Sequence, residues 1–225
     1  MNKLILFDID GTLTSAAIGH IEAHAVAYQK VFGLYGSIYM VDYNGVTDKQ
    51  ITKSVLSHLG VDEATIEAKI AEHMRVMEEY YVSLKPYLHP RLLPGVSEVL
   101  QKLNEDDNVL LGNVTGNLPG IAYAKLELAG ISDYFKVGGF GDESYVRADL
   151  VKNAIEKARA MGFEGDDVYV IGDTPSDIIA GIAANVKTIG VATGSYDEQT
   201  LKNAGANVTL SDLSDFEALS RALLM

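Results

Sequence analysis

Apolar residues occur along the chain in two patterns, as short continuous runs and as longer stretches with helical spacing. The first run, Leu-Ile-Leu-Phe at residues 4–7, is unbroken, and such a run predicts a strand buried on both faces, as in a parallel sheet. Similar runs recur later, most of them followed by polar residues or glycine. The further strands that we expect are residues 109–114, 135–137, 168–171, 188–192 and 207–210.

Residues 14–85 show only the helical pattern. Apolar residues at positions 18, 21, 25, 28 and 32 recur at spacings of three and four, which places them on one face of an amphipathic helix. Thr47 and Gln50 have the spacing of a capping box that opens a second helix. Asp62 caps a third helix, which Pro86 ends. We therefore expect an all-helical block inserted after the first strand.

Strands and helices alternate again after this block, which indicates right-handed crossovers and a parallel sheet covered on both faces. The predicted fold class is thus α/β. Residues 1–13 and 86–225 would form the sheet-containing core, and residues 14–85 would form an inserted all-helical cap domain. At 225 residues, the chain is long enough for these two parts.

Three of the expected strands end in polar turns that contain glycine. Because the sites of parallel sheets lie beyond the carboxyl ends of the strands, the side chains of these turns converge if the strands are neighbours. Carboxylates are ligands that Mg²⁺ prefers, and a hydroxyl with backbone N–H groups suits phosphate oxygens. One Asp-Gly turn is common as a simple strand cap, but three such turns predict magnesium-assisted phosphoryl transfer. The residues concerned are Asp8 and Asp10, Thr115, Gly116 and Asn117, and Asp173 and Asp177.

The net charge of -13 argues against binding to nucleic-acid backbones and to anionic membrane surfaces, since both attract basic proteins. The chain has no cysteine, which excludes disulfides and thiolate chemistry. No apolar stretch approaches the roughly 20 residues of a membrane helix, and the first residues lack the pattern of a signal peptide. We expect a cytoplasmic monomer or homodimer that acts on a small phosphorylated metabolite, with no nucleic-acid or membrane partner.

These motifs resemble those of the haloacid dehalogenase superfamily, and within it the phosphoglycolate-phosphatase-like branch with a helical cap of the C1 type. The segment Asp8-Ile-Asp-Gly-Thr is similar to the first motif of the family, Thr115 to its second, and residues 172–177 to its fourth. Residues 93–96, Leu-Pro-Gly-Val, resemble the return from cap to core. The resemblance spans nearly the whole chain and implies a Rossmann-like core of the haloacid dehalogenase kind.

The resemblance also implies a magnesium-dependent phosphatase that works through an aspartyl-phosphate intermediate. Asp8 would be the nucleophile, and Asp10 would act first as the general acid and then as the general base. Mg²⁺ would be bound by the Asp8 carboxylate, the main-chain carbonyl of Asp10 and Asp173. Asp177 would lie close by and orient a metal-bound water or the basic residue opposite.

The same resemblance assigns residues that would hold the substrate. Thr115 and the N–H groups near Gly116 and Asn117 would bind the transferred phosphoryl group. A segment of the cap is similar to the substrate loop of the family. The candidate residues of that loop are Asn44, Gly45 and Thr47.

The third motif departs from the family pattern. The family normally has a lysine here, whereas this chain has Arg147, in Tyr-Val-Arg-Ala-Asp at residues 145–149, with Lys152 further along the expected helix. An arginine keeps the positive charge and can bind phosphate through two N–H groups. We therefore predict that Arg147, rather than Lys152, supplies the cation of the site.

Two other functions stay open at this point. A phosphomutase of the β-phosphoglucomutase kind would use the same Asp8 and Asp10 but transfer the phosphoryl group to a second sugar hydroxyl instead of water. A non-catalytic member would bind a metabolite or a partner protein. The departure at Arg147 supports this last alternative, whereas the four retained carboxylates argue against it.

Two further groups in the cap have a weaker pattern. His20 and His24 are four residues apart and would share one helix face, where they could form a metal-binding pair. No third ligand is evident nearby, so we expect them to be exposed helix histidines. Tyr35, Tyr39 and Tyr43 are expected to pack between cap and core.

Overall fold

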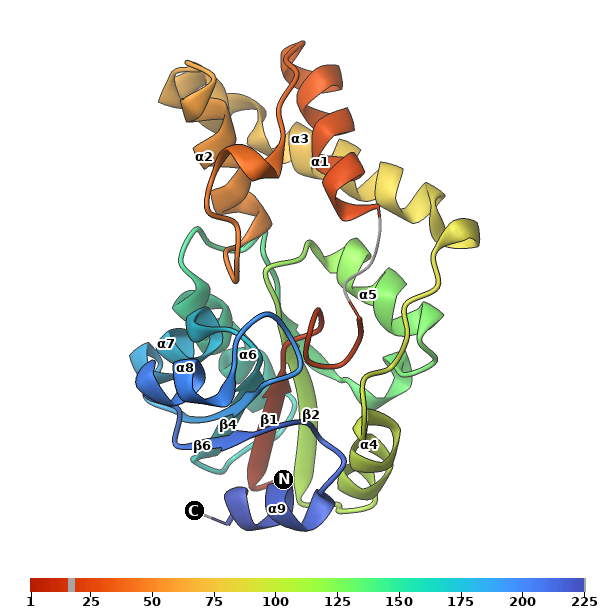
Figure 1. The fold of residues 1–225 in the computed structure, drawn as a ribbon, viewed down its shortest axis with the longest axis vertical. Helices are drawn as coiled ribbons and strands as arrows, with labels where there is room; N and C mark the ends of the chain where they lie inside the picture. The colour runs from red at the N-terminus through yellow and green to blue at the C-terminus, as the bar shows by residue number, and fades with distance from the viewer. Residues whose placement is uncertain (16–18, 225) are drawn as a thin grey trace.

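The computed structural model describes residues 1–15 and 19–224. A six-stranded sheet with the order β3-β2-β1-β4-β5-β6 forms its centre, and every neighbouring pair of strands is parallel (Figure 1). The expected strands are present, although the one predicted at residues 135–137 begins two residues later. The strands are β1 (Lys3–Phe7), β2 (Val109–Val114), β3 (Val137–Gly139), β4 (Asp167–Gly172), β5 (Lys187–Val191) and β6 (Val208–Leu210).

Helices cover both faces of the sheet, which confirms the predicted fold class. Leu4 and Leu6 of β1 belong to one apolar cluster, with residues of α6 (Arg147–Ala160) and α7 (Pro175–Ala183). Ile5 and Phe7 belong to the cluster of the opposite face. The helices of that face are α4 (Val96–Asn104), α5 (Pro119–Leu128) and α9 (Phe216–Ala222). The remaining core helix, α8 (Glu198–Asn203), connects β5 to β6.

Three helices between β1 and α4, which we call the cap, lie beyond the carboxyl ends of the strands (Figure 1). They are α1 (His20–Ala27), α2 (Asp48–His58) and α3 (Glu63–Ser83). Thr47 Oγ1 accepts a hydrogen bond from Gln50 N at 3.1 Å, and Asp62 Oδ1 accepts one from Thr65 N at 3.0 Å. These N-caps are the ones that the sequence predicts, and they fix where α2 and α3 begin.

Short helical turns complete the connections. A single π-helical turn, η1 (Tyr28–Phe32), extends α1 and ends at Gly33, whose φ of 69° only glycine adopts readily. The 3-10 turns are η2 (Ile38–Met40), η3 (Lys85–Tyr87) and η4 (Ser132–Tyr134). Within the described residues, no helix combines the length and the apolar character that crossing a membrane requires.

The chain leaves the core and returns to it along two adjacent segments. Leu93 N donates to the Leu13 carbonyl at 3.0 Å, and Ser15 N donates to the Arg91 carbonyl at 2.8 Å. The apolar cluster inside the cap also includes Leu118, Ile121 and Ala124 of the core. The division into a core of residues 1–13 and 86–225 and a cap domain of residues 14–85 stays a prediction. The packing shows in addition that α5 of the core contacts the apolar interior of the cap.

The expected packing of the tyrosines is wrong for two of the three. Tyr35 and Tyr39 are 86% and 65% exposed, so neither is covered by the core. Ile38, which lies between them in the chain, is the buried residue of this turn. Tyr43, in contrast, lines the cavity described next.

Candidate active site

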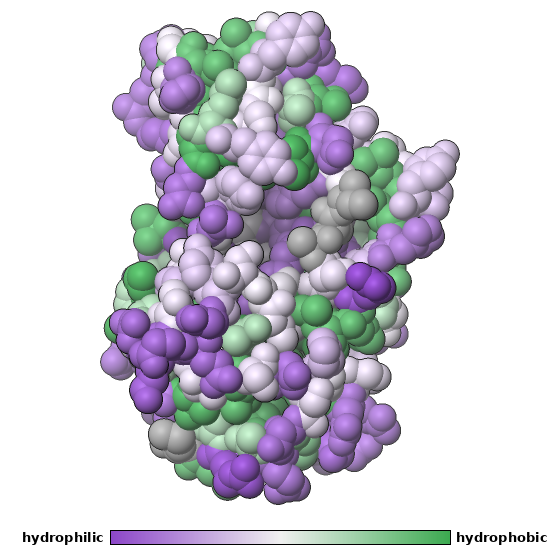
Figure 2. All heavy atoms as spheres, viewed as in Figure 1, coloured by the Kyte–Doolittle hydropathy of each residue, from purple (hydrophilic) through white to green (hydrophobic). Residues whose placement is uncertain are grey.

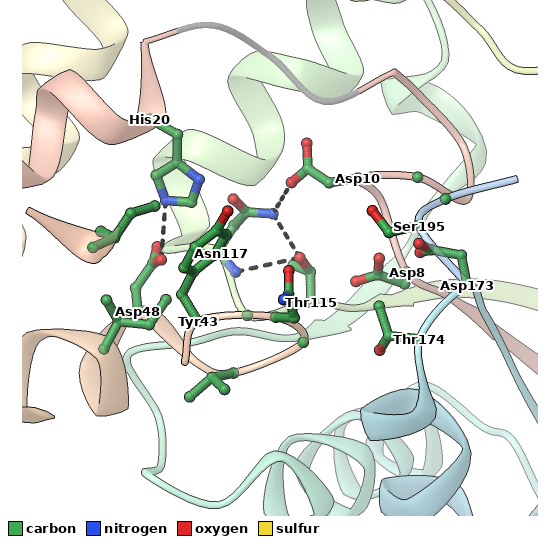
Figure 3. Close-up of a pocket in the computed structure, with 18 of the residues that line it drawn as sticks. Asp8, Asp10, His20, Tyr43, Asp48, Thr115, Asn117, Asp173, Thr174 and Ser195 are labelled. Carbon is green, nitrogen blue, oxygen red and sulfur yellow. Dashed lines mark hydrogen bonds and ion pairs between the residues drawn. The ribbon is translucent and has the colours of Figure 1, made fainter. Parts of the chain in front are cut away.

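Three polar turns meet at the carboxyl edge of the sheet, as the sequence predicts. β1 lies between β2 and β4, so the turns that follow these strands are neighbours. Their side chains line a cavity between the sheet and the cap (Figure 3). The predicted site residues in this lining are Asp8, Asp10, Asn44, Gly45, Thr115, Gly116, Asn117, Arg147 and Asp173.

Arg147, the first residue of α6, binds two carboxylates of the site. Its Nη2 donates to Asp8 Oδ1 at 2.7 Å and to Asp177 Oδ1 at 2.5 Å, and its side chain is only 10% exposed. Lys152 lies five residues further along α6, and its side chain is 54% exposed. Arg147 therefore lines the cavity and pairs with its carboxylates, whereas Lys152 does not line it.

Asp177 is held behind the cavity by the start of α7. Its Oδ2 accepts hydrogen bonds from Thr174 N at 3.0 Å and Thr174 Oγ1 at 2.7 Å, and its own N–H donates to Thr174 Oγ1 at 3.3 Å. This is a capping box, which the Thr-Pro-Ser-Asp sequence encodes locally. Because Asp177 Oδ2 is used in this capping box, Asp177 Oδ1 is the oxygen that faces Arg147.

Three buried carboxylates crowd the end of β1. One oxygen each of Asp8, Asp173 and Asp177 lies within 4.8 Å of the other two, and Arg147 pairs with Asp8 and Asp177 but not with Asp173. Burial, followed by the charge of Asp177, raises the pKa of Asp8 well above its ordinary value and raises the pKa of Asp173 to about 7. Negative charge is thus in excess here, and a divalent cation would stabilise the ionised forms. A set of carboxylate oxygens is also what Mg²⁺ prefers.

The backbone is packed closely around Asp173. Gly11 has a φ of 84°, and a Cβ at this position would lie 2.5 Å from Asp173 Oδ2. Thr12 Oγ1 donates to Asp173 Oδ1 at 3.0 Å. The glycine in the turn after β1 therefore serves both the conformation of the turn and the approach of the third carboxylate.

Asp10 belongs to a second polar network on the other side of the cavity. Lys125 Nζ donates to Asp10 Oδ2 at 2.5 Å and to Asn117 Oδ1 at 2.8 Å, and Asn117 Nδ2 donates to Asp10 Oδ2 at 2.8 Å. Burial disfavours the ionised carboxylate, but the positive charge of Lys125 and the hydrogen bonds from Lys125 and Asn117 together lower the pKa of Asp10 below its ordinary value. Asp10 Oδ1 is buried and has no hydrogen-bond partner among the described residues.

Lys125 is a site residue that the sequence reasoning missed. It lies on α5 with only 1% of its side chain exposed. A signal was present, because Leu118, Ile121 and Lys125 follow one another at spacings of three and four, which puts the lysine on the apolar face of the helix. A lysine in that position is almost never fully buried without a partner.

Thr115 has a hydroxyl that is set up to donate. Its Oγ1 accepts from Asn117 Nδ2 at 2.7 Å and from Asn117 N at 3.3 Å. These two bonds use the lone pairs of the oxygen, so the hydroxyl hydrogen stays available for an acceptor in the cavity. A phosphate oxygen is such an acceptor.

The cap loop before α2 is docked onto the core. Arg147 Nη1 donates to the Gly45 carbonyl at 3.2 Å, and Asp48 N donates to the Gly116 carbonyl at 2.8 Å. Asn44 and Gly45 line the cavity, as the resemblance implied. Thr47 is buried as the N-cap of α2 and is not part of the lining.

The expectation of exposed histidines on the first cap helix is wrong. His24 is 1% exposed, and His20 is 23% exposed and faces the cavity. Asp48 is the third member of the group, because its Oδ1 lies 2.9 Å from His20 Nε2 and 3.3 Å from His24 Nε2. Asp48 Oδ2 accepts from Leu118 N at 3.0 Å, which ties the group to the core.

Asp48 escaped notice because it is the first residue of α2, where an acid is expected simply to offset the helix dipole. Burial disfavours its ionised form, yet the contacts with His20 and His24 together lower the pKa of Asp48 below its ordinary value. Burial lowers the pKa of His24. The group thus combines an ionised carboxylate with a neutral buried imidazole at the cap end of the cavity.

The sequence also matches a known family when it is compared with family models. The model of haloacid dehalogenase-like hydrolases matches residues 5–191, from β1 to the end of β5. This chain belongs to the haloacid dehalogenase-like hydrolase family. The expected family and the expected enzyme class, a hydrolase, are therefore confirmed.

Named relatives of this hydrolase match it over nearly its whole length at low identity. The probable phosphatase IndB of Dickeya dadantii is 25% identical, and the match covers 100% of this chain and 96% of IndB. The pyrophosphatase PpaX of Oceanobacillus iheyensis is 26% identical over 95% of this chain and 94% of PpaX. A phosphoglycolate phosphatase of Aquifex aeolicus is 23% identical over 96% of each chain.

Solved structures of other proteins share the fold of this chain. A hydrolase from Pseudomonas syringae superposes with a TM-score of 0.71 at 23% identity, over 98% of this chain and 99% of that one. CbbY from Rhodobacter sphaeroides in complex with phosphate superposes with a TM-score of 0.68 at 20% identity, over 96% of each chain. These likenesses extend to the cap as well as the sheet, because they cover almost all residues.

Proposed function

We propose that this hydrolase is a magnesium-dependent phosphatase that acts on a small phosphomonoester through an aspartyl-phosphate on Asp8. The arrangement of Asp8 and Asp10 carries the proposal. Asp8 is grouped with two further carboxylates and Arg147, while Asp10, two residues later in the same turn, is held separately by Lys125. The names of the phosphatase relatives support the same reaction class.

In the first step, Asp8 attacks the phosphorus atom of the ester. Arg147 contacts Oδ1 of Asp8, which leaves Oδ2 as the attacking oxygen. The new bond joins Asp8 Oδ2 to phosphorus, and the bond between phosphorus and the alcohol oxygen breaks. Asp10 gives its proton to that oxygen, so the alcohol leaves neutral.

In the second step, water replaces Asp8 on phosphorus. Asp10, now ionised, takes a proton from the water while the water oxygen bonds to phosphorus. The bond from phosphorus to Asp8 breaks, inorganic phosphate leaves, and both carboxylates return to their starting state. The low pKa that Lys125 confers on Asp10 favours the ionised form on which this half of the cycle depends.

The phosphoryl group would be held from two sides. The Thr115 hydroxyl, with its hydrogen unused, would donate to one phosphate oxygen. The Arg147 guanidinium would bind a second phosphate oxygen and would hold the Asp8 carboxylate in position for attack. Asp8 and Asp173, with the main-chain carbonyl of Asp10, would hold Mg²⁺, which when bound offsets the repulsion between carboxylate and phosphate.

The test is the hydrolysis of p-nitrophenyl phosphate with and without magnesium. We expect turnover in Mg²⁺ and a loss of at least about 100-fold in excess EDTA, because the three crowded carboxylates would then face the phosphate uncompensated. Activity should return when Mg²⁺ is restored. Equal turnover in the presence of EDTA would contradict the proposal.

Replacing Lys125 should change the pH dependence of the reaction. The first step needs protonated Asp10, and the charge of Lys125 lowers the pKa of Asp10. In Lys125→Met this pKa rises, so the protonated acid persists to higher pH. We expect the basic limb of kcat/KM to move upward by at least about one pH unit.

The profile should be measured with an alkyl phosphate, whose alkoxide leaving group depends on the acid. Lys152→Met makes the same chemical change at an exposed position of α6 and should leave the profile where it is. A basic limb that stays in place in Lys125→Met would show that Lys125 does not act through Asp10.

A further inference from the structure

The cavity continues well beyond the groups that would hold a phosphoryl group. Its volume is about 540 Å³, within the range of sites for ligands much larger than glycolate or phosphate. Figure 2 shows the hollow on this face between the cap and the sheet-containing part of the molecule. The end away from Asp8 is covered by the cap, so this is where the leaving group of a phosphomonoester would lie.

The cap end of the cavity is mostly apolar. Side chains from α1, η2, α2 and the loop before α2 contribute to this wall. The apolar and aromatic residues that form it are Ile21, Ile38, Tyr43, Val46 and Ile51. Such a wall packs against the carbon framework of a ligand and gives nothing that would compensate a negative charge.

The positively charged side chains that line the cavity are already paired with carboxylates. Among the described residues that line it, the lysine and arginine side chains are Lys125 and Arg147, and both are paired with carboxylates of the reaction centre. At the cap end, the two histidines surround Asp48. A leaving group with a carboxylate or a phosphate would therefore lie near a carboxylate without a free cation.

The group of His20, His24 and Asp48 is also fixed in place. Asp48 accepts from Leu118 N through its side chain and donates from its own N–H to the Gly116 carbonyl. It cannot turn away from the cavity without losing these bonds. What the group presents to a ligand is a carboxylate and the edge of an imidazole, which suit hydroxyl groups as hydrogen-bond partners (Figure 3).

We propose that the cap end of the cavity is a subsite for an uncharged leaving group that carries several hydroxyls, so that the substrate is the phosphomonoester of a neutral polyhydroxy alcohol. The inference rests on the proposed phosphatase function and makes it more specific. It separates this chain from its relatives named for phosphoglycolate and pyrophosphate, whose leaving groups are anionic.

The sharpest test compares two substrates of nearly equal size. Phosphoglycolate carries a carboxylate where 2-hydroxyethyl phosphate carries a neutral hydroxymethyl group. We expect kcat/KM to be at least about 10-fold higher for 2-hydroxyethyl phosphate, and higher still for ribose 5-phosphate, which fills more of the cavity. Pyrophosphate should be poorer than either neutral ester.

Two variants of the cap loop then test whether Asp48 causes the preference for the neutral ester. Asp48→Asn removes the negative charge of the subsite and should reduce the ratio between 2-hydroxyethyl phosphate and phosphoglycolate at least about threefold. Asp42→Asn makes the same change at an exposed residue of the same loop and should keep the wild-type ratio. The ratio is measured within each variant, so a general loss of activity does not affect it.

Hydrolysis of p-nitrophenyl phosphate distinguishes a failure of the proposed subsite from a failure of the proposed phosphatase function. If the wild-type enzyme hydrolyses it in Mg²⁺ but uses phosphoglycolate or pyrophosphate as well as the neutral esters, the subsite is wrong and the phosphatase function stands. If none of these compounds is hydrolysed, both proposals fall. An unchanged ratio in Asp48→Asn would remove Asp48 from the subsite.

Discussion

Asp8→Asn is expected to abolish phosphate release, with a loss of about 10⁴-fold or more in kcat. The amide has the size of the carboxylate but lacks the anionic oxygen that attacks phosphorus. Folding should be retained, because burial and the charge of Asp177 already raise the pKa of Asp8 and an uncharged side chain relieves that repulsion. We expect the Tm of the variant to equal or exceed that of the wild type.

The measurement pairs steady-state phosphate release with mass spectrometry of the protein after brief exposure to substrate. The wild type should carry one phosphoryl group on the peptide that contains Asp8, and the variant none. Asp107→Asn, in the exposed turn before β2, makes the same change at the far edge of the sheet and should be fully active. More than a tenth of wild-type turnover in Asp8→Asn would show that another group attacks phosphorus.

Arg147→Ala is expected to lower kcat/KM by about 10³-fold, the effect of removing an arginine that stabilises a transferring phosphoryl group. The guanidinium bridges Asp8 and Asp177, and without it these buried carboxylates repel each other and Asp8 loses its orientation. Arg147→Lys should recover part of the activity, since an ammonium group restores the charge but not the planar fork.

Lys152→Ala is the matched control for this prediction. Lys152 belongs to the same helix, but it is exposed and away from the cavity, so we expect wild-type kinetics. The opposite result, with full turnover in Arg147→Ala and loss in Lys152→Ala, would reassign the cation of the site.

The strands were predictable where their own residues are apolar. The unbroken run in β1 indicates burial on both faces, and its alternate side chains do contact opposite layers of helices. β3 was misplaced because two of its three residues are glycines, which have little preference for strands. Gly138 and Gly139 form a strand because β2 offers them backbone partners, and that information lies more than twenty residues away.

The residues of the site were likewise predictable only where they follow a strand in the sequence. Asp8, Asp10, Thr115 and Asp173 follow directly on strands, so the rule that parallel strands end at one edge was enough to gather them. Lys125 reaches Asp10 from a helix on another segment. The helical spacing places Lys125 on the buried face of α5, but which carboxylate it meets depends on how the elements pack, and the local sequence does not encode that partner.

The histidines show the limit most clearly. Their helical spacing was visible, and what was missing was the partner that holds them, Asp48 of a different helix. With that partner unseen, the pattern of an exposed face was the natural interpretation. A polar residue on a helix can be judged only when the surface that it meets is known.

The docking of the cap loop has a consequence for the turnover cycle. Asp48 N bonds the Gly116 carbonyl, Leu118 N bonds the Asp48 carboxylate, and Lys49 N donates to the Gly141 carbonyl at 3.3 Å. Lifting the cap would break these three bonds together, and two of them involve the segment after β2 that would hold the phosphoryl group in the proposed reaction. In the proposed reaction, a single opening movement would therefore both admit solvent and weaken the contacts that hold the cleaved phosphate.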